Sequence, residues 1–220
     1  MINEGIISHN LPKSPESEAY RILRTNIQFI GIDTSKKILL VTSSGPGEGK
    51  TITTANIAVA FSQYGSKVLV IDGDLRKSRI HKLFDRSNRR GLTNALMEPD
   101  KIHDYIVATD IQNLSLLTSG PLPPNPSELL GSNKMKIILG MLEEEYDFIF
   151  IDSPPVGMVT DAQILSTLAD GTLLVAAAEQ VTVDAFKSAV VLLQNVNANI
   201  IGVVLNKLDR QSHGYYYYYR

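Results

Sequence analysis

The sequence predicts an α/β fold built on a doubly wound, mostly parallel β-sheet. Short apolar runs alternate along the chain with longer amphipathic stretches, which is typical of buried parallel strands joined by crossover helices. A glycine-rich turn follows the first apolar run directly and leads into a helical stretch. In such sheets ligands bind at the carboxyl ends of the strands, so we expect the functional residues at that edge.

The composition narrows the class of protein further. At 220 residues, with 44% hydrophobic and 20% charged residues, the chain is expected to form one globular domain. Its net charge of −2 argues against a nucleic-acid binder that depends on phosphate contacts. The absence of cysteine excludes disulfides and thiolate metal sites and fits a reducing cytoplasm. No apolar run approaches the roughly 20 residues of a membrane span, so we expect membrane association to come through a partner.

The first expected helix covers about residues 14–30. Ser14 can cap it, and Pro15 suits the first helical position. At helical spacing the apolar residues share one face, namely Ala19, Tyr20, Ile22, Leu23, Ile27 and Ile30. The polar residues share the opposite face, namely Glu18, Arg21, Arg24, Thr25 and Gln28. Spacing alone predicts that the apolar face packs on the body and that the polar face meets solvent.

The rest of the chain divides into strands and helices by the same periodicity. Six apolar runs are expected to be strands, at residues 37–43, 67–74, 114–120, 146–153, 171–178 and 199–207. Four amphipathic stretches are expected to be helices, at residues 50–65, 126–145, 161–170 and 182–196. The proline-rich loop 120–128 leads into the second of these helices, with Ser127 as its expected cap.

A phosphate-binding loop is the clearest functional motif. The segment SSGPGEGKT, residues 43–51, lies between an expected strand and an expected helix, which is the context that a P-loop requires. Lys50 would bridge the β- and γ-phosphates, and the Thr51 hydroxyl would ligate Mg²⁺. The strict pattern has glycine where this chain has Ser44, and the alternative is a plain glycine turn that caps a helix. The residues expected to bind nucleotide are Ser44, Gly45, Pro46, Gly47, Glu48, Gly49, Lys50, Thr51 and Thr53.

Acidic residues end two of the expected strands. Asp72 and Asp74 follow the run VLVI, and Asp152 follows FIFI. A carboxylate after an apolar strand is the Walker B arrangement, in which the aspartate holds Mg²⁺ directly or through water. Any one of the three could be an ordinary turn aspartate, but all three beside a phosphate loop predict a P-loop NTPase fold with a catalytic Mg²⁺ site.

Several motifs together carry a resemblance to a known family. They are the P-loop SSGPGEGKT, the acidic motifs VLVIDGDLRKS and FIFIDSPP, the segments EAYRILR and GPLPPNPSELL, and the terminal HGYYYYYR. Over nearly its whole length the chain resembles the bacterial tyrosine kinases of capsular and exopolysaccharide biosynthesis, in the cytoplasmic Gram-positive form that works with a separate membrane adaptor. The resemblance implies ATP- and Mg²⁺-dependent autophosphorylation of the terminal cluster Tyr215, Tyr216, Tyr217, Tyr218 and Tyr219.

The resemblance also suggests roles for single residues. Asp72 is the candidate base for the tyrosine hydroxyl, whose ordinary pKa of about 10 calls for a nearby carboxylate. Asp74 and Asp152 would organise the Mg²⁺ shell together with Thr51. Arg76 would either steady the charge of the transferred phosphate or lie in solvent at a helix start. By analogy with related ATPases, Asn206 is the candidate adenine contact.

Three positions depart from the patterns of related proteins. Gly45 stands where plasmid-partition and septum-site ATPases carry a second lysine that reaches across a nucleotide-sandwiched dimer, which argues against a switch ATPase. Ser78 stands where the family often has proline, so we expect a locally altered loop. The run LLVAAAEQVT lacks an arginine associated with the large membrane-fused relatives. Besides a tyrosine kinase and a switch ATPase, a third possible function is a non-catalytic, nucleotide-binding regulatory subunit of a polysaccharide export complex.

The resemblance predicts how the chain assembles. EAYRILR matches a Glu-x-x-Arg-x-x-Arg element that carries ring contacts, which implies an octamer held through Glu18, Arg21 and Arg24. We divide the chain into a kinase domain, residues 1–206, and a flexible tail, residues 207–220. Fully extended, the tail would reach about 45 Å, enough to enter a neighbouring active site.

Overall fold

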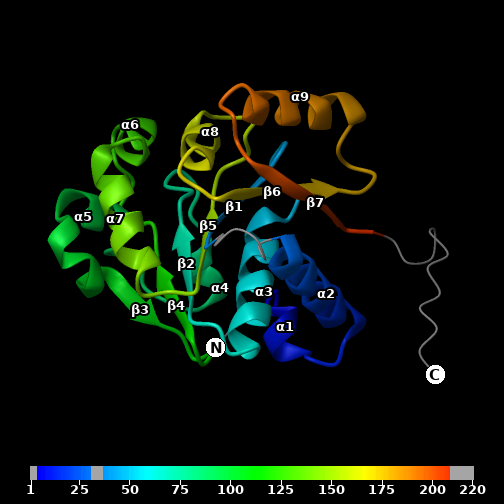
Figure 1. Cartoon of the computed structure of the whole chain (residues 1–220), viewed down its shortest axis with the longest axis horizontal. Helices are drawn as coiled ribbons and strands as arrows, with labels where there is room; N and C mark the ends of the chain where they lie inside the picture. Colours follow the sequence, from blue (N-terminus) through cyan, green and yellow to red (C-terminus); the bar gives the residue numbers. More distant parts are fainter. Residues whose placement is uncertain (1–3, 31–36, 209–220) are drawn as a thin grey trace.

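The computed structural model of the chain describes residues 4–30 and 37–208. Within them, a seven-stranded sheet lies between layers of helices (Figure 1). Its strand order is β3-β4-β2-β5-β1-β6-β7, and all neighbouring pairs are parallel except β3 and β4. The predicted doubly wound α/β fold is therefore confirmed.

All six expected strands form, with ends that differ by a few residues from the expected ones. They are β1 (Ile38–Ser43), β2 (Val68–Asp72), β4 (Leu114–Leu117), β5 (Phe148–Asp152), β6 (Gly171–Ala177) and β7 (Ile200–Asn206). The additional strand β3 (Ile106–Ala108) pairs antiparallel with β4 at one edge of the sheet. With three residues it is too short to show a periodicity in the sequence.

The expected helices form as well, one of them in two pieces. The helices that correspond to expected ones are α2 (Pro15–Ile30), α3 (Lys50–Gln63), α6 (Pro126–Leu130), α7 (Asn133–Glu143), α8 (Asp161–Ser166) and α9 (Val183–Gln194). The sequence did not predict α1 (Ile7–Asn10), α4 (Ile80–Leu83), α5 (Leu92–Met97) and the 3₁₀ segment η1 (Pro99–Tyr105). Each of these has seven residues or fewer, so each offers too few turns for a helical period to be recognised.

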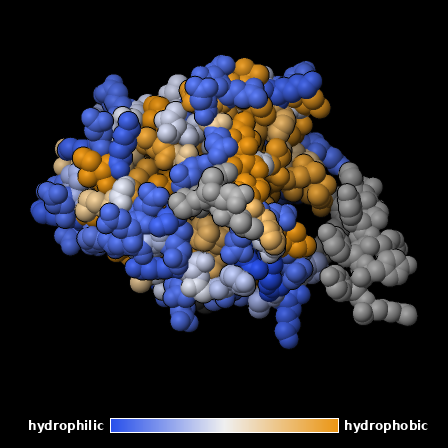
Figure 2. All heavy atoms as spheres, viewed as in Figure 1, coloured by the Kyte–Doolittle hydropathy of each residue, from blue (hydrophilic) through white to orange (hydrophobic). Residues whose placement is uncertain are grey.

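The sheet is buried on both faces, as the continuous apolar runs predicted. Alternate residues of one strand enter different clusters: Leu39 and Val41 pack with α3, whereas Ile38 and Leu40 pack with α5 and α7. Figure 1 shows α1, α2 and α3 on one side of the sheet and α5 and α7 on the other. At the free edge, β7 carries Val203 and Leu205, each about half exposed, and Figure 2 shows hydrophobic surface over this region.

The N-terminal segment is fastened to α3. Asn56, fully buried in α3, donates to the Gly5 carbonyl oxygen and accepts the Ser8 N–H. Ser14 caps α2 as expected, since its hydroxyl oxygen accepts the Ser17 N–H at 3.2 Å. None of the helices in the described ranges combines the length and the apolar character needed to cross a membrane.

The expected apolar face of α2 is only partly correct. Tyr20, Leu23 and Ile27 pack against the core, but Ala19, Ile22 and Ile30 are exposed. Phe29, outside the expected face, is 67% exposed. The reason is that α2 contacts α3 along a narrow stripe of its surface. The expected apolar face is broader than this stripe, so part of it packs on the core and part of it meets solvent.

Phe61 is the residue on which we test this core. It is fully buried in α3, and its ring centroid lies 4.3 Å from that of Phe148 and 5.3 Å from that of Phe150. We expect Phe61→Ala to lower the free energy of unfolding by about 3–5 kcal/mol because it leaves a cavity between α3 and β5. Urea denaturation measures this. The exposed Phe29→Ala is the matched control, and an equal loss in both variants would contradict the packing described here.

Candidate active site

The phosphate loop has the backbone of an anion-binding turn. It connects β1 to α3, and Gly47 and Gly49 adopt positive φ angles of 79° and 97°, which favour glycine. A Cβ at Gly49 would lie 2.0 Å from the Asn206 amide nitrogen, so this position also lacks room for a side chain. Lys50 is the first residue of α3. The loop thus points backbone N–H groups and a helix N-terminus at one place, the geometry that binds phosphate.

The side chain of Glu48 holds the phosphate loop in place through hydrogen bonds. Its buried carboxylate accepts the Ser44 hydroxyl at 2.5 Å, the Gly45 N–H, and the Ala177 N–H at 3.3 Å. The side chain therefore ties the loop to the end of β6. Of the residues expected to bind nucleotide, Glu48 has its carboxylate turned toward the protein, which leaves its backbone N–H as the group available to a phosphate.

The end of β7 holds the loop from the other side. The Asn206 amide donates to the Glu48 carbonyl oxygen at 2.9 Å. Lys207 Nζ donates to the Gly47 carbonyl oxygen at 2.7 Å and to Gln180 Oε1 at 2.9 Å. Lys207, the first residue of the expected tail, thus contacts the phosphate loop, and a single lysine after a strand has no periodicity from which this contact could be predicted.

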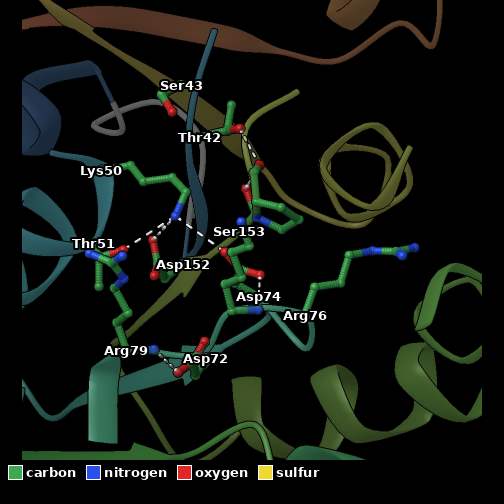
Figure 3. A network of polar contacts seen from close by, with 12 residues as sticks. Thr42, Ser43, Lys50, Thr51, Asp72, Asp74, Arg76, Arg79, Asp152 and Ser153 are labelled. Carbon is green, nitrogen blue, oxygen red and sulfur yellow. Dashed lines mark hydrogen bonds and ion pairs between the residues drawn. The ribbon is translucent and has the colours of Figure 1, made fainter. Parts of the chain in front are cut away.

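Lys50 lies among the acidic strand ends (Figure 3). Its Nζ is 3.4 Å from Asp74 Oδ2, 3.9 Å from Asp152 Oδ1 and 3.3 Å from Thr51 Oγ1. Asp72 lies close by, and its Oδ2 accepts the Ile80 N–H at 3.1 Å. The structure therefore brings together the four residues that the sequence marked as catalytic.

The sheet register explains why these acids meet. Asp72 and Asp152 are direct partners in the parallel pair of β2 and β5, at the carboxyl end of both strands. Gly73 then runs close to β5, since its N–H donates to the Asp152 carbonyl oxygen at 2.8 Å and a Cβ there would lie 2.8 Å from the same atom. Glycine at this position lets the chain bring Asp74 back toward Lys50.

Burial shifts the acid equilibria of two of these groups. Burial and then the nearby Asp152 charge raise the pKa of Asp72 well above its ordinary value. Burial also raises the pKa of Asp152 to about 6, although the Lys50 charge opposes the shift. Asp72 Oδ1 and Asp152 Oδ2 are buried and have no hydrogen-bond partner within residues 4–30 and 37–208. The site therefore holds more negative charge than its one lysine compensates.

This donor set fits Mg²⁺ bound together with a phosphorylated ligand. Thr51, Asp74 and Asp152 present oxygen atoms around Lys50, and the free Asp152 oxygen is a group that a cation would satisfy. The described residues contain no cluster of three acidic or histidine side chains that forms a metal site by itself. Mg²⁺ commonly uses only one or two carboxylates and takes its other ligands from substrate phosphates and water, so Thr51, Asp74 and Asp152 are suitable partners.

Three expectations about single residues are corrected. Thr53 is fully buried in α3 close to Tyr20, on the side of the helix opposite Thr51 because two residues correspond to more than half a turn. Ser127 does not cap α6, and its hydroxyl donates to Asp161 Oδ1 at 2.6 Å. Arg76 binds Asp161, and Figure 3 shows its side chain directed away from Lys50. Arg76 is exposed to solvent, as one of its two expected settings required, but its guanidinium is paired with Asp161 and does not face the phosphate loop.

The expected assembly face is partly paired within the chain. Arg21 forms an ion pair with Glu18 at 2.6 Å and donates to the Pro12 carbonyl oxygen. The Arg24 guanidinium lies 4.1 Å from the centroid of the Tyr64 ring. Glu18 and Arg21 remain partly exposed. Tyr215 to Tyr219 lie outside the described residues.

The fold and the loop together define a P-loop nucleotide-binding domain, and residues 35–204 match the family described as the AAA domain. The chain is 44% identical to the putative tyrosine-protein kinase CapB of Staphylococcus aureus, over 96% of this chain and 93% of CapB. It is 40% identical to the tyrosine-protein kinase YwqD of Bacillus subtilis (strain 168), over 99% and 92%. The crystal structure of the chimerical protein CapA2B2 superposes with a TM-score of 0.90 at 40% identity, covering 94% of this chain and 92% of the chimera.

These similarities extend over nearly the whole of this chain and nearly the whole of each relative. The chain belongs to the bacterial tyrosine-protein kinases of capsule and exopolysaccharide biosynthesis, in the group whose kinase is a separate chain.

Asp152→Asn tests the cost of burying a charge in this site. The native pKa of Asp152, about 6, exceeds the ordinary 3.8, so the folded protein loses stability as the pH rises from about 4 to 6, and the full loss is present above 6. The rise in pKa from 3.8 to about 6 corresponds to about 3 kcal/mol, so we expect the ligand-free variant to melt about 6–12 °C higher than the parent at pH 7.5, at 2–4 °C per kcal/mol. The gap should shrink toward pH 5. Circular dichroism at both pH values measures it, and a gap of equal size at both would contradict the raised pKa.

Proposed function

We propose that this protein transfers the γ-phosphoryl group of ATP to tyrosine, that its own C-terminal tyrosines are acceptors in a neighbouring subunit, and that it thereby regulates capsule or exopolysaccharide synthesis or export. The observation that carries the proposal is the position of Lys50 between Asp74 and Asp152 at the end of the phosphate loop, with Asp72 one strand away.

The phosphate loop and Lys50 would bind the phosphates of ATP. Backbone N–H groups of residues 45–51 would surround the phosphates, and Lys50 would leave its acidic partners to neutralise the β- and γ-phosphate oxygens. Mg²⁺, held by Thr51, Asp74 and Asp152, would supply further positive charge to the transferring group. Asn206 remains the proposed adenine contact. Its bond to the Glu48 carbonyl oxygen places it beside the loop that would hold the phosphates.

Asp72 is the proposed base. Its raised pKa brings its basicity nearer to that of a tyrosine hydroxyl, which favours proton transfer. Asp152 would hold Mg²⁺, whose charge would reduce the repulsion between Asp152 and Asp72 and so favour the ionised form of Asp72. The tyrosine oxygen then forms a bond to the γ-phosphorus, the bond from that phosphorus to the β–γ bridging oxygen breaks, the proton passes to Asp72, and ADP leaves.

The C-terminal tail starts at the catalytic edge of the sheet. Lys207 contacts the phosphate loop, and residues 209–220 can extend by at most about 40 Å. A tether of that length keeps acceptor tyrosines at a high effective concentration near an active site. In a ring, the acceptor for each site would be the tail of the next subunit.

A ring contact through Glu18, Arg21 and Arg24 is also proposed. Ile22 is 40% exposed and Phe29 67% exposed on the same helix, and an aromatic residue near arginines is typical of the surface that becomes the core of an interface. The resemblance suggests eight subunits. The CapA2B2 chimera supports a second partner, a transmembrane adaptor that would recruit the kinase from the cytoplasm to the inner face of the membrane.

Mixing two variants tests the transfer between subunits. Lys50→Met, with its tail intact, should lose activity by about 100-fold or more because it lacks the phosphate charge partner. We incubate it with ATP, Mg²⁺, the cytoplasmic segment of an adaptor and an active chain that lacks residues 215–220. Mass spectrometry should find phosphotyrosine on the tail of the Lys50→Met chain.

The controls separate the parts of this proposal. Lys50→Met incubated alone should stay unlabelled. If the mixed sample is also unlabelled while the intact parent labels itself at a rate independent of concentration, transfer occurs within one chain. An intact parent without phosphotyrosine would overturn the kinase assignment itself.

The α2 contact is tested by light scattering. Replacing Glu18, Arg21 and Arg24 by alanine should reduce the ring to monomers. Because Arg24 also packs on Tyr64, a second variant, Glu18→Arg with Arg21→Glu, keeps an internal pair and reverses the surface charges. A control variant changes Asp184 and Lys187, exposed on α9, to alanine. A monomeric parent at high concentration, or rings in both α2 variants, would refute this contact.

A further inference from the structure

Asp161 is a buried carboxylate outside the phosphate site. It is the first residue of α8 and is fully buried. Arg76 reaches it with two nitrogen atoms: Nε lies 2.9 Å from Asp161 Oδ2 and a terminal nitrogen 3.1 Å from Oδ1. Ser127 completes the group, because its hydroxyl donates to Asp161 Oδ1 at 2.6 Å and accepts from Arg76 at 3.0 Å.

This cluster joins three segments of the chain that are distant in the sequence. Arg76 comes from the loop after β2, Ser127 from the start of α6, and Asp161 from the start of α8, 85 residues beyond Arg76. A buried charge is tolerated when it is paired and fully hydrogen-bonded, and the two-nitrogen contact of an arginine fixes direction as well as distance. The loop after β2 is therefore anchored at Arg76.

The anchored loop carries Asp74. The Asp74 side chain accepts the Lys77 N–H at 2.9 Å through Oδ1 and lies 3.4 Å from Lys50 Nζ through Oδ2. Arg76 stands between the two ends of this short turn. Any shift of the backbone at Arg76 would displace both the carboxylate of Asp74 and the N–H group that orients it.

We infer that Arg76, Asp161 and Ser127 form a positioning cluster that sets the carboxylate of Asp74 for Mg²⁺ and, through it, the geometry of phosphoryl transfer. Arg76 acts through Asp74 and does not touch the phosphates. This inference rests on the proposed Mg²⁺ site, so its tests include one that needs neither metal nor nucleotide.

The metal-free test is hydrogen exchange. In Arg76→Gln and in Asp161→Asn, the peptide that covers residues 73–78 should exchange faster than in the parent, since the Lys77 N–H loses its fixed acceptor. Peptides from α3 and β5 should keep the exchange of the parent. Unchanged exchange in residues 73–78 in both variants would overturn the positioning role, whatever the activity of the protein.

The second test separates metal from nucleotide. We measure binding of a fluorescent ADP analogue with and without Mg²⁺. In both variants, the Mg²⁺ concentration that gives half of the Mg²⁺ effect on nucleotide affinity should be about 10-fold or more higher than in the parent. This is the range found when an outer-shell partner of a metal ligand is removed. Binding without Mg²⁺ should stay close to that of the parent. A parent whose affinity does not respond to Mg²⁺ would instead count against the proposed metal site, leaving the exchange result to decide this inference.

Matched variants exclude simpler explanations. Arg86→Gln and Asp110→Asn break another arginine–aspartate pair, with a distance of 2.6 Å, and should change neither readout. If Arg76 contacted phosphate directly, Asp161→Asn would behave like the parent while Arg76→Gln would not, and that result would overturn the inference. The double variant should be no worse than either single one, because both remove the same contact. If Asp161→Asn fails to fold, Ser127→Ala and Arg76→Lys must show the same direction with smaller effect, and parent-like exchange in both would reject the cluster.

Discussion

The structure depends on one electrostatic constraint, the burial of three carboxylates around a single lysine. Asp72 and Asp152 are fully buried and Asp74 nearly so, and Lys50 forms ion pairs with Asp74 and Asp152. Burial disfavours ionisation of a carboxyl group, and it raises the pKa of Asp152 to about 6 although the Lys50 charge opposes the shift. Mg²⁺ held by Thr51, Asp74 and Asp152 would supply positive charge beside these carboxylates, and Lys50 would then be able to face the phosphates of a nucleotide.

Side chains outside the acidic cluster hold the two loops that carry its residues. Glu48 ties the phosphate loop to the end of β6, and the Asn206–Lys207 junction ties it to the end of β7. Arg76 and Asp161 do the same for the loop that carries Asp74. In each case a polar side chain binds a loop to the scaffold, while Asp72 Oδ1 and Asp152 Oδ2 have no hydrogen-bond partner among the described residues. This is how a site keeps free carboxylate oxygens in a buried place.

The sequence predicted the parts whose signal is local. β1, the glycine-rich turn and the Lys50 helix follow one another in the chain, and the acidic ends of β2 and β5 follow apolar runs, so both could be recognised by pattern. The sequence could not predict pairs such as Arg76 with Asp161, because each partner has an ordinary local setting and only the fold brings them together. The same limit explains α2: periodicity identified its apolar residues, but Ile22 and Ile30 turned outward because neighbouring α3 covers only a stripe.

Both ends of the described chain converge on the helix that bears Lys50. Near the N-terminus, Asn56 of α3 binds the backbone of Gly5 and Ser8, and at the C-terminal end Lys207 binds Gly47 just before the same helix. A pull on the tail would therefore act first on the phosphate loop, and a contact formed by α2 would act on α3 through its packed stripe. In the proposed mechanism, assembly through α2 and binding of an acceptor tail would therefore act on Lys50 through these direct contacts.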